Sequence, residues 1–262
     1  MGVERVSDVD DPRLADYRDL KDGARRRRDG TFIAESRQVV RRLLGGSRFR
    51  ARSVLAAEAA AEDLRDVLTG GLPVYVAPEA TLQRVVGFNI HRGCLAVGER
   101  GAELALDGLL DARVLLVLEG VTNPDNIGGA FRNAMAFGVG GVVLAPRCSD
   151  PLYRKAIRVS MGGTLVVPFA AAASWPEALV RLRERGFTIV ALTPDGGADI
   201  AEFGTSRPVP ERVALLLGAE AEGVSAAARA AADVLVAIRM AGGGHSLNVA
   251  TASGIALHRF TR

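Results

Sequence analysis

The chain has 262 residues, 48% of them hydrophobic, which is enough for one large domain or two modest ones around a buried core. The net charge is only +3, and its two cysteines, Cys94 and Cys148, have no Cys or His at metal-ligand spacing, so we expect neither a disulfide nor a metal site. No run of about 18 apolar residues appears, and the N-terminus carries charges where a secretory signal needs an apolar centre, so we expect a cytoplasmic protein.

Positive charge is concentrated near the N-terminus. Residues 13–52 contain 13 Lys and Arg against 5 Asp and Glu, whereas the rest of the chain is net acidic. Such a segment is typical of a surface that binds a polyanion such as RNA, although 31 of the 33 basic residues are Arg, so a solvated helix face is the alternative. The candidate RNA-binding residues are Arg25, Arg26, Arg27, Arg28, Arg41 and Arg42.

Residues 1–100 have an alternating pattern that predicts a small α/β domain. We expect helices over residues 12–28, 36–44, 57–68 and 79–86, and strands over residues 31–34, 53–56, 73–76 and 94–97. Ser36 is a candidate N-cap. Residues 101–111 are charged and contain glycine, which is typical of a linker.

Residues 112–262 predict a second domain with a parallel sheet, because their apolar runs are continuous rather than alternating. We expect strands over residues 114–118, 142–144, 165–167, 187–192, 213–217 and 234–238. Helices are expected over residues 127–137, which Gly138 can close, 152–160, 176–185 and from Leu247 onward.

Three polar turns in this second domain carry candidate functional residues. The first places Asn126 at or next to a helix N-cap, with Gly128 and Gly129 leaving the first helical turn open to the approach of a backbone or a ribose, and Arg132 further along the helix. The second, residues 216–225, offers Gly218 for close backbone approach and Glu220 as a carboxylate, with Glu222 as a rival acid. The third begins with three glycines, Gly242, Gly243 and Gly244, and continues through His245, Ser246 as a candidate cap, Leu247 and Asn248.

In this order, the turns LEGVTNPDNIGGAFRNAMAFG, LLGAEAEGVS and SLNVATASGIALH resemble the three motifs of the SpoU (TrmH) family of the SPOUT superfamily. The resemblance implies an S-adenosylmethionine-dependent RNA ribose 2′-O-methyltransferase, a C-terminal deep trefoil knot and a homodimer. Its matching catalytic positions are Arg132, Asn126, Glu220, Ser246 and Asn248, and its cofactor-binding positions are Leu217, Gly218, Ile238, Met240 and Leu247. The segment FIAESRQVVRRLL resembles the ribosomal-protein-like substrate-binding domain that many members carry, although Ser36 stands where Gly is common.

The family assigns Arg132 to the 2′-hydroxyl. A guanidinium is a weak base in water, so Arg132 is either an activated base or a cation that stabilises the developing alkoxide. Two further departures from the family pattern are Arg239, where Pro is usual, and Ala250, where Ser is usual. His245 has no family role, and whether it contacts RNA stays open.

The N-terminal resemblance favours 23S ribosomal RNA as the substrate, with transfer RNA as the nearest alternative. A catalytically silent RNA-binding assembly factor of the same fold is a second alternative, which the matched motif residues disfavour. A nucleotide-dependent oxidoreductase lacks support, since no GxGxxG follows the first strand of either half. The modified nucleotide cannot be read from the sequence, because ribose recognition leaves base identity to other contacts.

Overall fold

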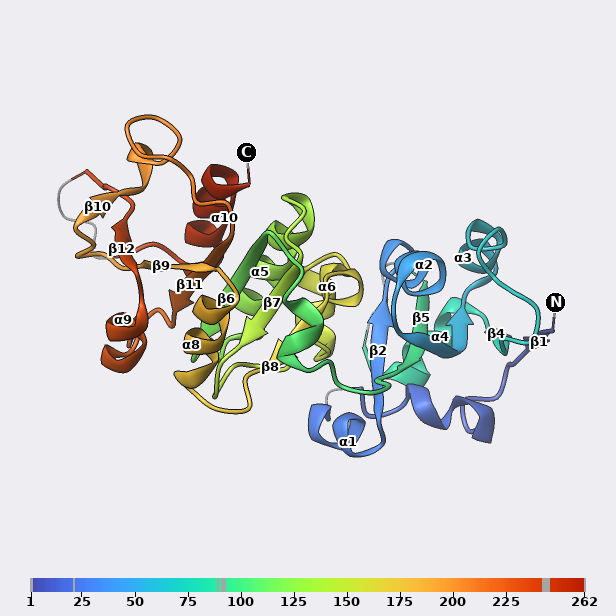
Figure 1. The fold of residues 1–262 in the computed structure, drawn as a ribbon. Helices are drawn as coiled ribbons and strands as arrows, with labels where there is room; N and C mark the ends of the chain where they lie inside the picture. The colour runs from blue at the N-terminus through green and yellow to red at the C-terminus, as the bar shows by residue number, and fades with distance from the viewer. Residues whose placement is uncertain (1, 21, 89, 91–92, 242–245, 262) are drawn as a thin grey trace. The chain divides into compact units, whose positions relative to one another are not determined.

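A computed structural model describes residues 2–20, 22–88, 90, 93–241 and 246–261 (Figure 1). The chain divides into two compact units. The first comprises Met1–Ala102 and Leu152–Val166, and the second comprises Glu103–Pro151 and Val167–Arg262. Residues 152–166 therefore pack with the first unit, although we expected them to belong to the domain of residues 112–262.

The first unit contains a five-stranded mixed sheet in the order β1-β4-β3-β5-β2. Strand β5 runs antiparallel to β2 and β3, whereas β3, β4 and β1 pair in parallel. The strands are β1 Val3–Arg5, β2 Thr31–Glu35, β3 Arg50–Ala56, β4 Val74–Val76 and β5 Cys94–Glu99. The helices are η1 Pro12–Tyr17, α1 Gly23–Arg28, α2 Arg37–Gly46, α3 Glu58–Asp63, α4 Glu79–Val86, α6 Arg154–Val159 and α7 Gly163–Val166. The predicted small α/β fold is confirmed.

The prediction of one continuous helix over residues 12–28 is wrong. A short 3-10 helix, η1, ends at Tyr17, and α1 begins only at Gly23. Between them Asp19 adopts a positive φ of 52°, and the Asp22 side chain accepts a hydrogen bond from the Arg25 backbone N–H as the N-cap of α1. An aspartate that caps a new helix start competes with helix continuation, which explains the break.

Ser36 connects β2 to α2 in a conformation that favours glycine. Its φ of 95° and ψ of 150° lie in a region that residues with a Cβ rarely adopt. Its hydroxyl accepts a hydrogen bond from the Val39 backbone N–H over 3.5 Å, which confirms the predicted N-cap. The serine thus adopts a backbone geometry that glycine adopts freely, and it does so under strain.

The second unit contains a seven-stranded sheet in the order β10-β12-β9-β11-β6-β7-β8, and every pairing within it is parallel. Its strands are β6 Val114–Glu119, β7 Gly141–Leu144, β8 Phe169–Ala171, β9 Thr188–Leu192, β10 Ala198–Asp199, β11 Val213–Gly218 and β12 Val234–Ala237. Its helices are η2 Leu106–Leu109, α5 Pro124–Ala136, α8 Glu177–Glu184, η3 Ile200–Glu202, α9 Ala226–Ala231 and α10 Val249–Phe260. This sheet confirms the predicted parallel α/β fold.

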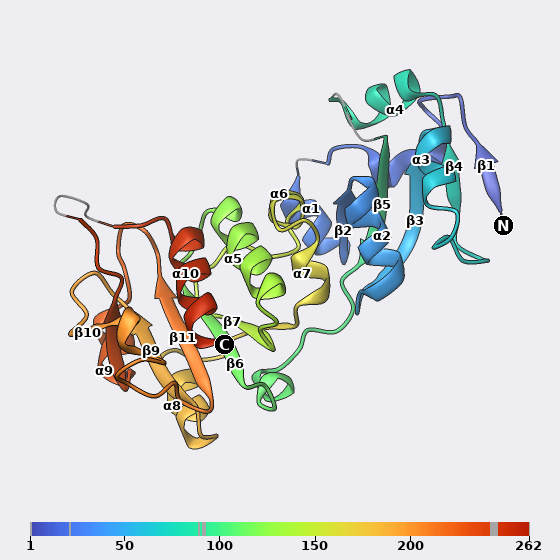
Figure 2. The same cartoon turned by 90° about the horizontal axis from the view of Figure 1, so that it is seen from above.

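Helices cover both faces of the second sheet. Figure 2 shows α5 and α10 side by side on one face and α8 with α9 on the other. This double covering explains why β6 and β7 are buried along their whole length. In a parallel sheet the carboxyl ends of the strands lie at one edge, so the turns after β6, β9, β11 and β12 are brought together there.

Some predicted elements differ from the observed ones. Residues 163–166 form helix α7 instead of a strand, and the edge strand is β8, Phe169–Ala171. The short elements β10 and α9 were not predicted, because two to six residues are too few to show a period. The trefoil knot stays a prediction. No helix among the described residues combines the length and apolar character needed to cross a membrane.

Candidate active site

Three side chains from the three predicted turns meet at the carboxyl edge of the second sheet. The Asn126 Nδ2 donates to Glu220 Oε1 over 3.0 Å, and the Asn248 Nδ2 donates to the same oxygen over 2.6 Å. The Asn248 Nδ2 also donates to Asn126 Oδ1 over 2.8 Å. The polar cluster of Asn126, Glu220 and Asn248 is therefore one hydrogen-bonded group, built from positions up to 122 residues apart.

Asn126 lies inside α5, whereas it was expected at or next to the N-cap of this helix. Asn123 is the N-cap, and its Oδ1 accepts from the Asp125 N–H over 2.9 Å, while Pro124 takes the first helical position. Asn126 is thereby the third residue of the helix and is buried, with 7% of its surface exposed. Because Asn123 serves the helix terminus, the amide of Asn126 remains available for Glu220 and Asn248.

The N-cap of α10 is Asn248, so the expectation that Ser246 caps this helix is wrong. The Asn248 Oδ1 accepts from the backbone N–H groups of Ala250 and Thr251, over 3.0 and 3.2 Å. Its oxygen fixes the helix end while its nitrogen serves the polar cluster. Gly242–Gly244 and His245 lie outside the described residues.

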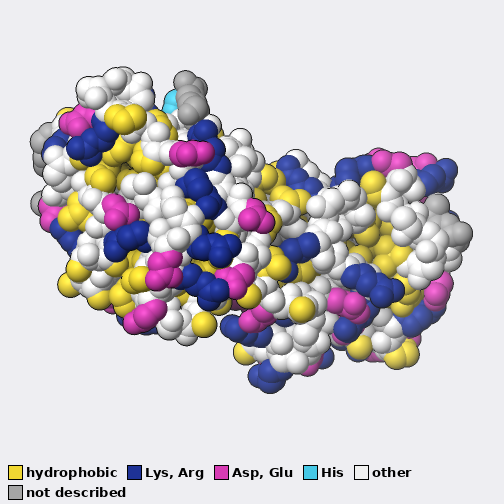
Figure 3. Space-filling model, in the orientation of Figure 1, with side chains coloured by type: hydrophobic (Ala, Val, Ile, Leu, Met, Phe, Trp, Pro, Cys, Tyr) yellow, Lys and Arg dark blue, Asp and Glu magenta, His cyan; other side chains and the backbone are white. Residues whose placement is uncertain are grey.

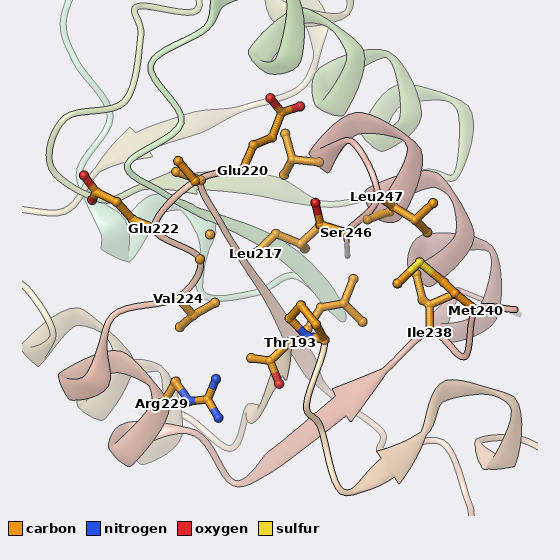
Figure 4. Close-up of a pocket in the computed structure, with 18 residues that line it drawn as sticks. Thr193, Leu217, Glu220, Glu222, Val224, Arg229, Ile238, Met240, Ser246 and Leu247 are labelled. Carbon is orange, nitrogen blue, oxygen red and sulfur yellow. The ribbon is translucent and has the colours of Figure 1, made fainter. Parts of the chain in front are cut away.

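A cavity of about 420 Å³ lies next to the polar cluster (Figure 4). Its lining includes all five predicted cofactor-binding residues, namely Leu217, Gly218, Ile238, Met240 and Leu247, together with Glu220 and Ser246. Leu192, Thr193 and Pro194, at the end of β9, also line it but were not singled out from the sequence. The position of this turn after a buried parallel strand was the available signal.

The turn after β11 is folded tightly upon itself. A Cβ on Gly218 would lie 2.1 Å from the backbone of Gly223, so the close approach that glycine permits here is between two parts of the turn. The Gly223 N–H donates to the Ala219 carbonyl over 2.8 Å. The turn is thus a compact structure that presents Glu220 to the two asparagines.

The structure separates the two rival acids of this turn. Glu222 accepts a hydrogen bond from Arg147 over 2.6 Å, and this contact lowers the pKa of the Glu222 carboxyl. Both side chains of that pair are well exposed. Glu220 instead faces Asn126 and Asn248, so Glu220 is the acid that belongs to the polar cluster.

Arg132 lies on α5 and is exposed to solvent. Its side chain makes no hydrogen bond or ion pair with any residue that the structure describes. The structure therefore does not bring Arg132 into the polar cluster.

Gly129 makes room for the close approach of α10, while the approach of a ribose, also expected here, stays a prediction. A Cβ at this position would lie 2.5 Å from the Cβ of Ala250. The neighbouring residue Asn133 ties the same two helices together, because its Nδ2 donates to the Ala250 carbonyl over 2.6 Å and to Ser253 Oγ over 3.0 Å. The small side chain of Ala250, a departure from the family pattern, thus lies at a close helix contact.

The predicted RNA-binding arginines in the first unit have different environments. Arg26 is buried and donates to the Arg18 carbonyl, and Arg42 donates to the Met161 carbonyl. Arg25 pairs with Asp19 and Asp29, and Arg41 pairs with Asp66. Only Arg27 and Arg28 of the six are exposed without a partner among the described residues. On the face shown in Figure 3, basic and acidic side chains are likewise interspersed.

The described residues also include two cysteines and side chains of the types that bind metal ions. Cys94 and Cys148 are both free thiols, and burial raises their pKa, that of Cys94 to about 12. Within the described ranges, no group of three or more His, Cys, Asp and Glu side chains is placed to hold a metal ion.

Comparisons with known proteins match this architecture. Residues 113–258 match the model of the SpoU rRNA Methylase family. An uncharacterized tRNA/rRNA methyltransferase of Mycobacterium tuberculosis is 44% identical over 100% of this chain and 93% of its own length. The 23S rRNA (guanosine-2′-O-)-methyltransferase RlmB of Ralstonia nicotianae is 32% identical over 76% of this chain and 80% of its own.

Solved structures agree over nearly the whole chain. An AdoMet-bound rRNA methyltransferase from Sinorhizobium meliloti has a TM-score of 0.79 and 25% identity, covering 98% of this chain and 97% of its own. The SpoU methyltransferase AviRb from Streptomyces viridochromogenes has a TM-score of 0.78 and 26% identity, covering 92% and 93%.

Proposed function

This chain belongs to the SpoU rRNA methylase family, and from that premise we propose that it methylates a ribose 2′-hydroxyl of 23S ribosomal RNA. It is an RNA ribose 2′-O-methyltransferase, and S-adenosylmethionine is its cofactor. The observation that carries the proposed site is the convergence of Asn126, Glu220 and Asn248 beside the cavity of about 420 Å³.

The cavity fits the cofactor in size and chemistry. Small-molecule pockets generally measure about 300 to 1,000 Å³ and combine apolar walls with a few polar groups. Here the walls are supplied by residues such as Leu217, Ile238 and Leu247, and the polar groups by the turns after β11 and before α10. We propose that Leu217, Gly218, Ile238, Met240 and Leu247 hold S-adenosylmethionine, which supplies an activated methyl group when bound.

The catalytic side chains have separate proposed roles. Asn126 and Asn248 hold Glu220 in one orientation, so that the turn that lines the cavity is fixed before substrate arrives. Ser246 lines the cavity and offers a hydroxyl at its edge. Arg132 is free of partners among the described residues, and its guanidinium approaches the 2′-hydroxyl as base or as alkoxide stabiliser.

The test of these roles is Arg132→Ala. Because Arg132 does not line the cavity, the variant is expected to bind S-adenosylmethionine as the wild-type protein does and to lose methyl transfer. Calorimetry with the cofactor and a transfer assay with RNA measure the two effects separately. Turnover near the wild-type rate in the purified variant would remove Arg132 from the mechanism.

We propose that the first unit binds the RNA. Arg27 and Arg28 are the two predicted contacts without a partner among the described residues, whereas Arg25 and Arg41 can exchange an exposed carboxylate for phosphate. Buried Arg26 supports the local structure instead. Replacing Arg27 and Arg28 together is expected to weaken RNA binding and to reduce its salt dependence, with cofactor affinity unchanged.

The substrate is identified by mapping 2′-O-methyl positions in total RNA from a deletion strain and its parent. Loss of one mark in 23S ribosomal RNA supports the proposal, and loss of one in transfer RNA supports the nearest alternative. If no mark is lost, a silent RNA-binding assembly factor becomes the better interpretation.

We also propose that the enzyme works as a homodimer in the cytoplasm, where its RNA substrate is available. Ile255 on α10 is one of the large apolar side chains exposed among the described residues, and a second copy of the chain would cover such a side chain. Light scattering of the purified protein measures the oligomeric state, and a monomer at all concentrations would contradict the proposal.

A further inference from the structure

Glu119 is the one acidic side chain that is buried among the described residues, with 8% of its surface exposed. It is the last residue of β6 and lies at the carboxyl edge of the second sheet. Burial of a carboxylate is unfavourable unless hydrogen bonds compensate for the lost water, so its partners indicate why it is there.

Each carboxylate oxygen of Glu119 has its own donor. The Trp175 Nε1–H donates to Oε1 over 2.6 Å, and the backbone N–H of Ser225 donates to Oε2 over 2.9 Å. Ser225 is also the N-cap of α9, since its hydroxyl accepts from the Ala228 N–H. Glu119 therefore connects β6 to the start of α9 and to Trp175, which precedes α8.

This connection closes the turn that carries Glu220. Strands β11 and β6 pair in parallel, and Gly218 at the end of β11 is the partner of Glu119 in this pairing. The turn that follows β11 therefore begins beside the Glu119 backbone. It ends at Ser225, which the Glu119 carboxylate holds. All six residues between these two points, 219–224, line the cavity.

We propose that Glu119 is a positioning residue for the methyl-transfer site. Its backbone lies beside Gly218 at one end of residues 219–224 and its carboxylate holds Ser225 at the other end, and the residue thereby sets where Glu220 meets Asn126 and Asn248. This role rests on the methyltransferase function proposed above, because the turn matters only if the cavity binds the cofactor. Nothing in the arrangement requires Glu119 to touch the cofactor or the RNA.

The test compares Glu119→Gln with the matched control Glu177→Gln, an exposed acid in the first turn of α8. A glutamine has one acceptor oxygen and one donor NH₂ group. In either orientation its NH₂ group therefore faces an N–H donor, that of Trp175 or that of Ser225, and one hydrogen bond is lost. We expect E119Q to weaken S-adenosylmethionine binding by about tenfold or more, the effect of losing one charged hydrogen bond. RNA affinity is expected to stay unchanged, as are both affinities of E177Q.

Two further measurements separate positioning from a general loss of stability. In E119Q/W175F the opposing Trp donor is absent, so cofactor affinity is expected to recover partly towards that of W175F alone. Trp175 is the only tryptophan of the chain, and its emission is expected to change on cofactor addition in the wild type but not in E119Q. A purely structural role would lower the melting temperature and the folded fraction, yet leave the Kd of the folded fraction and this emission change intact.

The outcomes are distinct. If the wild type binds S-adenosylmethionine and E119Q binds it and turns over equally well, the inference is overturned while the proposed function stands. If the wild type binds no cofactor, the proposed function fails, and the inference fails with it. Should E119Q not fold, Glu119→Asp replaces it, because its shorter side chain cannot span both donors and is expected to show the same loss to a smaller degree.

Discussion

The Asn248 side chain donates a hydrogen bond to the Asn126 side chain over 2.8 Å, across 122 positions of sequence. Asn248 begins α10 and Asn126 lies in the first turn of α5, so this bond joins the two helix starts at the edge of the sheet. Glu220 accepts from both asparagines. The bond therefore fixes the first and third polar turns relative to each other, with the second turn held between them.

Asn248→Asp tests this cluster while preserving the helix. Aspartate is as good an N-cap as asparagine, so α10 is expected to keep its stability. An ionised aspartate cannot donate, and it places a second negative charge beside Glu220, so the rate of methyl transfer is expected to fall by about 10- to 100-fold. Initial rates at saturating RNA measure the effect.

The matched control for that change is Asn123→Asp, which alters the N-cap of α5 outside the polar cluster. Its melting temperature and rate are expected to remain near those of the wild type. Equal rates for the Asn248 and Asn123 variants would show that the hydrogen bonds of the cluster are dispensable.

Gly129→Ala is expected to destabilise the second unit by about 1 to 3 kcal/mol, the usual effect of overpacking. The added Cβ would lie 2.5 Å from that of Ala250, and both helices are held by Asn133. Gly46→Ala serves as the control, since a Cβ there meets nothing within 4 Å. Urea unfolding measures the stability of both variants. The double change G129A/A250G is expected to be more stable than G129A alone. If it is not, the contact with Ala250 does not cause the loss of stability.

Ser36→Gly is expected to stabilise the first unit by about 1 kcal/mol. Glycine relieves a backbone strain of about 1 to 3 kcal/mol, while the loss of the serine cap and the added freedom of the unfolded chain oppose the gain. Ser36→Ala keeps the strain and loses the cap, so it is expected to destabilise. Thermal melts rank the stability of the wild type, Ser36→Gly and Ser36→Ala. A glycine variant less stable than the alanine variant would contradict the proposal that the Ser36 backbone is strained.

The ion pair between Asp195 and Arg229 predicts a specific acid titration. Two hydrogen bonds from Arg229 lower the pKa of Asp195 from 3.8 to about 2. A carboxyl whose folded pKa is lowered contributes stability above its unfolded pKa and loses it as the pH falls, so this contribution is lost between about pH 4 and pH 2. NMR titration of the carboxyl is expected to give a midpoint near 2 that returns towards 3.8 in Arg229→Gln; identical midpoints would contradict the assignment.

Much of the fold could be predicted from local patterns. The continuous apolar run of residues 114–118 predicted a parallel strand because both of its faces are covered, and Gly138 was predicted to end α5, where it adopts a φ of 66°. Helix starts were misplaced where two polar residues compete. The N-cap of α5 is Asn123, whereas it was expected at or next to Asn126. The N-cap of α10 is Asn248, whereas Ser246 was expected there.

The candidate site could be predicted in composition but not in its contacts. The three motifs supplied Asn126, Glu220 and Asn248, yet their hydrogen bonds depend on tertiary packing that spacing does not contain. For the same reason the sequence could not show that Gly129 faces Ala250. Nor could it show that Arg26 is buried, since a run of four arginines looks uniformly exposed.

The identity of the methylated product tests whether the protein transfers a methyl group to a ribose 2′-hydroxyl. Purified protein is incubated with labelled S-adenosylmethionine and with unmodified ribosomal or transfer RNA, and the RNA is then digested to nucleosides and analysed by mass spectrometry. We expect a 2′-O-methylated nucleoside whose formation is lost in Arg132→Ala. A label found only on a base, or no label in either RNA, would contradict this expectation.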